Sequence, residues 1–510
     1  MKKEKKVSDG FKSRWGFILA AMGSAIGLGN IWRYPVVAYS NGGGAFLIPY
    51  IVALLTAGIP ILILEFNLGN KFRCSAPAIF KKLHPKLEIV GWVQTFICIV
   101  VPVFYSALIG WLIYYLFQAF TLGWGSNTEA AFYNDFLNLP DVPSSAFALG
   151  GFNPLIVGLV ILVWIITGFV LFRGIENGIE KVNKIMVPTL LLMYALVVIY
   201  SLTLDGATAG LQQFFKPQWG MLKDPSIWLA AYGQVFFSTS IAAGIMLTYA
   251  SYTPKKTDLN SNAIITGLGN ASVELAAGFG VFAALGFLAL QNGSSVNDVV
   301  SGGPGLVFVV YPTVLNQLPP IIGPIIGVIF YLSLVFAGIS SLISLVEVVI
   351  ASLSEKFEVH RKKTVVIMMF VLCAFSLLIA TPAGLYLLDI LDHFANTYIW
   401  QTSGAIQSLV VVAVAISGKK VYELFGHGNE YSAIKVNPKF LAVVLTITGA
   451  LLVYFIINGV LIDIDPKTAY EGYPSYMLNV WGWGVVGIGM VFAIILTLSK
   501  SKKKLKKEEV

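Results

Sequence analysis

The sequence has little charge: Asp, Glu, Lys and Arg make up 12% of its 510 residues, while 57% of them are hydrophobic. So low a charged fraction excludes an ordinary soluble protein of this length and places the chain in a lipid bilayer. The net charge of +8 does not indicate nucleic acid as a partner, because the basic residues recur in alternate loops, as in membrane proteins.

Cysteine and histidine are also scarce. Cys74, Cys98 and Cys373 lie far apart without a CxxC pair, and the four histidines are equally scattered. This spacing argues against disulfides and transition-metal centres. The sequence also lacks Ser–His, paired-Asp and HExxH patterns, so we predict that the protein is not an enzyme.

The alternating ten-residue strands of a membrane β-barrel are lacking as well, whereas long apolar runs are frequent. A helix needs about 20 apolar residues to cross roughly 30 Å of hydrocarbon. The runs predict an all-α integral membrane protein with twelve transmembrane helices. They lie at about 14–39, 44–69, 90–120, 154–172, 182–202, 227–252, 263–290, 321–353, 364–381, 391–416, 438–460 and 478–499.

Lys and Arg concentrate in every second connection between these runs. The basic segments are 2–14, 71–86, 173–184, 255–256, 356–363, 419–439 and 500–507, whereas 121–152, 292–318 and 383–390 contain neither residue. The positive-inside rule therefore predicts a multi-pass protein of the cell membrane whose tails, 1–13 and 500–510, are both cytoplasmic. The basic C-terminal tail can contact anionic membrane lipid.

The first apolar run is poorly suited to a continuous helix. It holds Gly23, Gly27 and Gly29 within seven residues, followed by Asn30 and Arg33. Gly23 and Gly27 have the GxxxG spacing of close helix packing, but packing does not explain the two polar residues. We predict a break, because interrupted backbone at membrane depth is tolerated where it lines a binding cavity.

The sixth run has a second interruption at 234–244, where hydroxyl and small residues replace bulky apolar ones. Interruptions in runs one and six suggest two copies of five helices, at about 14–202 and 227–416, with inverted topology. Together they would form a ten-helix transport core, 14–416, to which 417–499 adds two further helices.

Neutral oxygens near the breaks predict two sodium sites, since freed carbonyls with short hydroxyls or amides can bind a dehydrated cation without burying net charge. One set comprises carbonyls of Gly23, Ile26 and Ala337 with the hydroxyls of Ser340 and Ser341. The other comprises the Ala25 carbonyl, Asn30, Ser238 and Asn270, and is one ligand short. The alternative for the two adjacent serines is helix packing through small residues.

Several motifs are specific to a known family. They are GLGNIWRYP at 27–35, NGGGAF at 41–46, PY at 49–50, RGIE at 173–176, GQVFFS at 233–238, TYASY at 248–252 and AGISS at 337–341. From residue 14 through the tenth helix, the chain resembles the neurotransmitter:sodium symporter family, and its prokaryotic amino-acid transporters in particular. The resemblance implies the family's fold, with a 5+5 inverted repeat and discontinuous helices 1 and 6.

The resemblance also implies roles for individual residues. The substrate carboxylate would complete the first sodium site, formed by Ala25, Asn30, Ser238 and Asn270, and would bind the N–H groups of Leu28 and Gly29 and the hydroxyl of Tyr105. The second sodium site would be that of Gly23, Ile26, Ala337, Ser340 and Ser341. Without the resemblance, Tyr105 would be interpreted as a packing aromatic. The substrate site would be lined by Ser24, Ala25, Gly27, Leu28, Gly29, Val101, Tyr105, Phe237, Ser238, Ser240, Ala243, Ser341 and Leu345.

Departures from the family pattern bear on the substrate. Relatives that carry amines without a carboxylate have an aspartate where this chain has Gly27, so the substrate is expected to be an amino acid. The small Ala243 and the apolar Val101 and Leu345 favour a hydrophobic or aromatic side chain.

Glu274 is an acid at membrane depth, which is costly and by default functional. Chloride-dependent relatives have a serine there, with chloride bound near groups that match Tyr50, Gln234 and Ser238. We therefore expect Glu274 to replace chloride; the alternative is a structural hydrogen bond. Glu65 and Glu347 are further intramembrane acids to which the sequence assigns no role.

Gates are also implied by the resemblance. Arg33 and Asp392 would form the outer pair, with Phe237 as an aromatic lid. Glu355 matches the acidic member of the inner pair, but its expected arginine falls on Ser8. This leaves Lys5, Lys6 and Lys12 as substitutes.

We therefore predict a sodium-coupled amino-acid symporter that works by alternating access, without chloride, as a monomer or weak homodimer. A substrate-gated channel or a non-transporting amino-acid sensor on the same scaffold is the alternative.

Overall fold

A computed structural model describes residues 10–300, 302–465 and 470–500. Within these residues, ten helices are long and apolar enough to cross a membrane, and a bent pair makes an eleventh span. The ten are Gly43–Phe72, Pro85–Ala119, Pro154–Phe172, Ile175–Leu202, Leu259–Asn292, Ile322–Phe357, Arg361–Ala380, Gly384–Ser417, Pro438–Ile464 and Ser475–Leu498. The sixth predicted run is divided into two shorter helices, so all twelve runs are helical.

The bent pair is the first predicted helix. It consists of α1 (Arg14–Ala25) and α2 (Leu28–Ser40), whose axes differ by 51°. Gly27 is extended, with φ −109° and ψ −170°, and ends the helical path. The Gly27 N–H donates to Oδ1 of Asn30 at 3.0 Å. A side chain three residues further along the chain thus supplies an acceptor for a backbone N–H at the break.

The second break separates α11 (Pro225–Ser238) from α12 (Ile245–Ser251). Ser240, Ala242 and Gly244 have φ angles of 54°, 59° and 76°. The left-handed region costs a non-glycine residue roughly 1 to 2 kcal/mol, so Ser240 and Ala242 hold it only because their surroundings impose it.

Side chains from neighbouring helices hold this break in place. Glu65 of α4 (Ile59–Phe72) accepts hydrogen bonds from the Ala242 N–H and from Gln407 of α20 (Gln401–Ser417), each at 2.8 Å. At the start of α20, Ser403 donates to the Ala242 carbonyl at 2.8 Å, and the preceding Trp400 donates to the Ile241 carbonyl at 2.5 Å. Glu65, to which the sequence assigned no role, therefore serves as a backbone acceptor.

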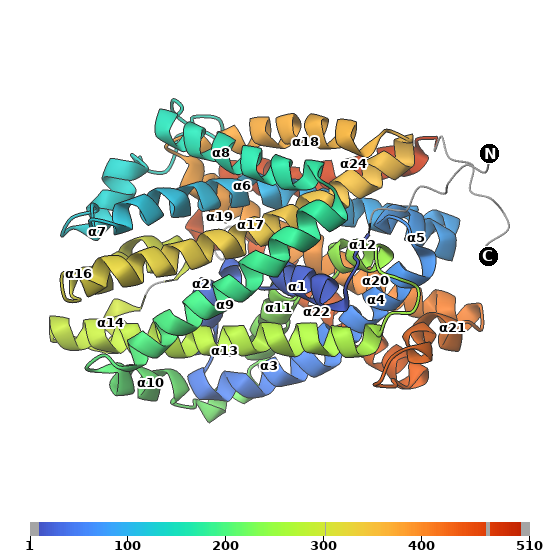
Figure 1. Cartoon of the computed structure of the whole chain (residues 1–510), viewed down its shortest axis with the longest axis horizontal. Helices are drawn as coiled ribbons and strands as arrows, with labels where there is room; N and C mark the ends of the chain where they lie inside the picture. The colour runs from blue at the N-terminus through green and yellow to red at the C-terminus, as the bar shows by residue number, and fades with distance from the viewer. Residues whose placement is uncertain (1–9, 301, 466–469, 501–510) are drawn as a thin grey trace.

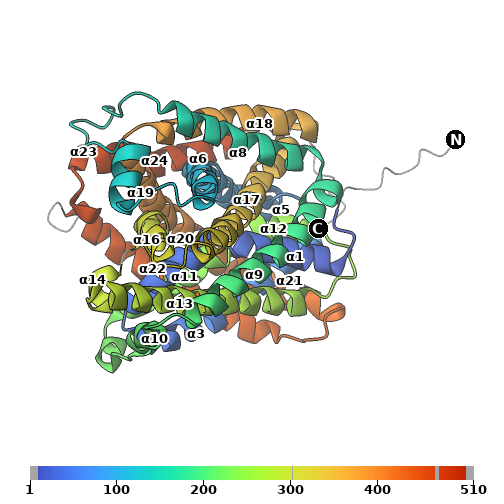
Figure 2. The same cartoon turned by 60° about the vertical axis from the view of Figure 1, so that its left-hand side comes forward.

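The broken helices lie in the middle of the molecule. Figures 1 and 2 show α1 in the interior, next to α9 (Lys181–Leu202) and α17 (Ile322–Phe357). The long helices α6 (Glu88–Ala119) and α13 (Leu259–Asn292) complete the inner layer, while α8 (Pro154–Phe172), α18 (Arg361–Ser376) and α24 (Gly484–Leu498) lie at the periphery (Figure 1).

One span differs from the sequence prediction. The tenth span begins at Gly384 rather than near 391, because α19 (Gly384–Phe394) continues through a π-helical turn into α20. The Gly- and Pro-rich stretch after α13 forms short helices, including α14 (Val296–Val299) and α16 (Tyr311–Asn316).

We expect Glu65→Ala to lower the free energy of unfolding by about 2 kcal/mol, because it leaves the buried Ala242 N–H without an acceptor. Glu65→Gln keeps one acceptor oxygen and should remain closer to the wild type. Thermal unfolding of the purified protein measures both. Glu423→Ala, which removes a surface ion pair with Lys71, is the control. Equal melting temperatures for Glu65→Ala and the wild type would contradict this role.

Candidate substrate and cation site

A cavity of about 790 Å³ opens between the two breaks, α6 and α17. It is lined by every residue predicted to contact substrate except one: Ser24, Ala25, Gly27, Leu28, Gly29, Val101, Tyr105, Phe237, Ser238, Ser240, Ser341 and Leu345. The exception is Ala243, which is fully buried and whose carbonyl accepts from the Cys98 thiol at 3.2 Å. Phe104 and Leu108, also on α6, add apolar side chains to the cavity wall, and the sequence analysis did not predict them.

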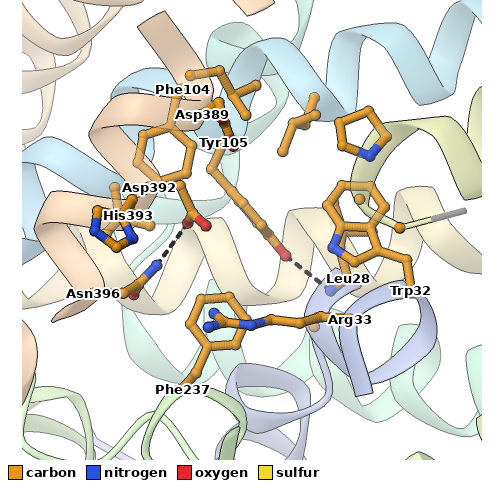
Figure 3. A pocket seen from close by; sticks show the side chains of 18 of the residues that line it. Leu28, Trp32, Arg33, Phe104, Tyr105, Phe237, Asp389, Asp392, His393 and Asn396 are labelled. Atoms are coloured by element: carbon orange, nitrogen blue, oxygen red, sulfur yellow. Dashed lines mark hydrogen bonds between the residues drawn. The ribbon is translucent and has the colours of Figure 1, made fainter. Parts of the chain in front are cut away.

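One end of the cavity suits an anion. The first N–H groups of α2 lack intrahelical acceptors and carry the positive end of the helix dipole. The Leu28 N–H lies 3.2 Å from the Tyr105 hydroxyl, which points toward it from α6 (Figure 3). A carboxylate placed here can accept from both groups.

Carbonyl and hydroxyl oxygens surround the other end of the cavity. The Ser240 hydroxyl donates to the Ser24 carbonyl at 2.9 Å, and Ser24 and Ser344 share a hydrogen bond of 2.7 Å. These neutral groups are suited to an ammonium group, which only donates hydrogen bonds.

The first predicted cation set converges at the two breaks. Asn30 donates from its amide to Oδ1 of Asn270 at 2.8 Å. With the Asn270 amide in this orientation, its Oδ1 lies 3.1 Å from the Ala25 carbonyl oxygen and 3.2 Å from the Ser238 carbonyl oxygen. Oδ1 of Asn270 thus faces two other acceptors, whereas an amide turned by 180° donates from its nitrogen to both carbonyls. Because Oδ1 of Asn30 accepts from the Gly27 N–H, Asn30 faces this cluster with its nitrogen.

Most of the second set also comes together, where α1 crosses α17. The Ser341 hydroxyl lies 3.2 Å from the carbonyl oxygens of both Gly23 and Ser24. The Ser340 hydroxyl lies 3.0 Å from the Ala337 carbonyl oxygen. Ile26, the fifth predicted member, is fully buried at the C-terminal cap of α1.

Glu274 of α13 lies among the neighbours predicted for it. It accepts from the Tyr50 hydroxyl and from Nε2 of Gln234 at 2.5 Å, and its side chain is fully buried. The described residues contain no group of three or more His, Cys, Asp or Glu side chains that could hold a metal ion.

On the side of Asp389 and Tyr470 the cavity is open. Arg33 lies over the Phe237 ring, 4.8 Å from its centroid, and forms no ion pair with Asp392. Asp392 instead accepts from Asn396 at 2.7 Å, with the two gate residues on opposite sides of the space between α2 and α19 (Figure 3). The predicted outer gate is therefore not closed by an ion pair in this conformation.

The opposite side is closed. The Phe11 N–H donates to the Tyr252 carbonyl at 3.1 Å, and Arg14 pairs with Asp258 at 3.2 Å. Lys12 pairs with Glu176 at 2.9 Å rather than with Glu355; the hydrogen bond to Glu176 raises the pKa of Lys12. Glu355 accepts from the Ser75 N–H at 2.7 Å. The other predicted partners, Lys5, Lys6 and the position of Ser8, lie outside the described residues.

A further contact on the closed side explains Glu347. Arg361 of α18 donates to both carboxylate oxygens of Glu347, at 2.5 and 2.6 Å, and the Tyr252 hydroxyl donates to the same side chain at 2.7 Å. The sequence analysis missed Arg361. The signal was available, because a lone acid within an apolar helix needs a base from the nearest basic segment.

Comparisons with known proteins agree with this architecture. The profile described as "Sodium:neurotransmitter symporter family" matches residues 8–137 and 125–504. An uncharacterized sodium-dependent transporter of Methanocaldococcus jannaschii is 39% identical over 496 residues, covering 97% of this chain and 98% of the relative. The sodium-dependent serotonin transporter of Drosophila melanogaster is 31% identical over 427 residues, covering 77% and 67%.

Among solved structures, MhsT in complex with L-phenylalanine superimposes with a TM-score of 0.74 at 32% identity, covering 88% of this chain and 99% of MhsT. The match confirms the predicted all-α transporter fold; the sequence predicted twelve spans, and the described residues contain ten, or eleven with the bent pair. The profile spans most of the chain, and the relatives are transporters. The chain is therefore a multi-pass membrane protein that belongs to the sodium:neurotransmitter symporter family.

Proposed function

We propose that this member of a sodium-dependent transporter family carries one hydrophobic or aromatic amino acid together with sodium into the cell, without chloride. The observation that carries the proposal is the pair of oxygen clusters at the two helix breaks, next to a cavity with an anion-binding end. The proposed orientation, with both termini cytoplasmic, makes the open side of the cavity extracellular and the closed side cytoplasmic.

Coupling follows from the position of the clusters. The cluster of Ala25, Ser238 and Asn270 adjoins the cavity, so the substrate carboxylate can complete the coordination of its sodium ion. Each ligand then tightens the binding of the other, since linkage is reciprocal. Inward sodium movement gains about 2.3 kcal/mol per charge for every 100 mV of membrane potential.

The substrate class follows from charge and shape. Gly27 and its neighbours bring no negative charge to the cavity, so the carboxylate must come from the ligand. The walls formed by Val101, Phe104, Leu108 and Leu345 are apolar and suit a large apolar side chain. The solved relative MhsT is complexed with L-phenylalanine, which fits the same description.

The buried Glu274 supports independence from chloride. Its carboxylate already supplies one negative charge among Tyr50 and Gln234, where a chloride ion would otherwise be needed.

Uptake into proteoliposomes tests the proposal against a substrate-gated channel. Under an inward sodium gradient we expect labelled L-phenylalanine, or another amino acid found by a thermal-shift screen, to accumulate above its equilibrium level. Replacing sodium with potassium should abolish accumulation. A channel would only equilibrate the amino acid, and a sensor would bind it without uptake.

Substitutions at the oxygen clusters should weaken the sodium response without unfolding the protein. For Asn270→Ala and Ser341→Ala we expect at least a tenfold rise in the sodium concentration that gives half-maximal amino-acid binding, corresponding to about 1.4 kcal/mol. Scintillation binding on purified protein measures this change. Ser272→Ala, at an exposed position on α13, is the control. Wild-type sodium dependence in both cluster variants would refute the assignments.

Glu274→Ser should make amino-acid binding dependent on chloride, because it removes the fixed charge but keeps the hydroxyl and amide donors of Tyr50 and Gln234. The measurement compares sodium chloride with sodium gluconate. Wild-type protein should bind equally in both salts, and the variant should bind only in chloride. Chloride dependence of the wild type would contradict the proposed role of Glu274.

A further inference from the structure

Asn183 carries an unpartnered oxygen in the interior of the molecule. It lies in the first turn of α9, and its side chain is fully buried. Its amide nitrogen donates to the Ile179 carbonyl at 2.9 Å, which fixes the orientation of the amide, while Oδ1 has no hydrogen-bond partner. A buried acceptor without a partner costs roughly 1 to 3 kcal/mol, so this oxygen requires an explanation.

The oxygen lies against Gly23, a predicted member of the second cation cluster. A methyl group placed on Gly23 would lie 2.3 Å from Oδ1 of Asn183 and 3.3 Å from Cβ of Ser340. The absence of a side chain at Gly23 thus lets α9 approach α1 closely at this point. The carbonyl of Gly23 and the hydroxyl of Ser340 are both predicted members of the cluster, so α9 brings the Asn183 oxygen against a residue of the cluster from a third helix.

Other polar groups nearby are already engaged. Glu180, one turn before Asn183, accepts from the Lys12 N–H and the Ser13 hydroxyl at 2.8 Å each and pairs with Lys184 at 2.6 Å. Asn183 therefore differs from Glu180 in having an oxygen free to bind a ligand. A neutral amide oxygen is a suitable ligand for a hard monovalent cation, as carbonyl oxygens are for other hard cations.

We propose that Oδ1 of Asn183 binds the sodium ion of the second cluster, as an additional ligand supplied by α9. The inference rests on the proposed function, which places sodium between α1 and α17. A sodium ion bound there would contact α9 as well as α1 and α17. Bound sodium would therefore hold α9 against α1, and release of the ion would allow the two helices to separate.

Sodium alone is the probe for the test. Purified full-length protein is titrated with sodium at constant ionic strength, with potassium as the replacement, and the rise in melting temperature gives the half-maximal sodium concentration. No amino acid is added, so the first cluster lacks the carboxylate that would complete it and the second cluster dominates the response.

For Asn183→Leu, which keeps the volume but removes the oxygen, we expect a rise in the half-maximal sodium concentration of at least about fivefold. Asn183→Asp keeps an oxygen and should retain or lower the wild-type value. Asn458→Leu on α22 (Pro438–Ile464) is a matched control, because Asn458 also donates to the carbonyl four residues earlier, at 2.8 Å, but lies at the exposed surface.

If Asn183→Leu melts too early in potassium to be titrated, Asn183→Ala replaces it with the same expectation. A wild-type sodium response in the variants that lack the oxygen would overturn the inference and leave the proposed function intact. A wild-type protein that sodium does not stabilise, and whose amino-acid binding ignores sodium, would overturn both.

Discussion

The structure depends on one constraint: a backbone polar group at membrane depth needs a partner from the protein or from a ligand. Two helices break this regularity, and their freed groups are satisfied in different ways. Around the second break, protein side chains take up the groups, with Glu65 accepting from the Ala242 N–H and Ser403 donating to its carbonyl. At the meeting of the two breaks, the carbonyl oxygens of Ala25 and Ser238 lie against the side chain of Asn270.

Each acid in the spans discussed above has identified donors. Glu65 binds backbone, Glu347 binds Arg361 and Tyr252, and Glu274 binds Tyr50 and Gln234. The three acids differ in the charge of the groups that donate hydrogen bonds to them. The guanidinium of Arg361 lies beside Glu347, whereas the hydrogen-bond donors of Glu274, Tyr50 and Gln234, are neutral.

The conformation is asymmetric. The N-terminal segment contacts Tyr252 and Asp258, and Arg361 of α18 contacts Glu347, while Arg33 and Asp392, which line the cavity, form no ion pair with each other. Alternating access requires that closed contacts on one side exchange with closed contacts on the other. Weak, exposed pairs such as Lys12 with Glu176 cost little to break, whereas the bidentate contact of Arg361 with Glu347 fixes α18 to α17 more firmly.

The sequence by itself determined the spans, the place of both breaks and the residues of the cavity wall that lie at the breaks, because apolar run length, glycine content and family motifs are local properties of the chain. Only the tertiary structure decided which side was open, which base paired with Glu347, and that Ala243 turned away from the cavity. It also brought Asn183 against Gly23. These contacts join helices distant in sequence, and their geometry depends on how closely two backbones approach, which no local pattern encodes.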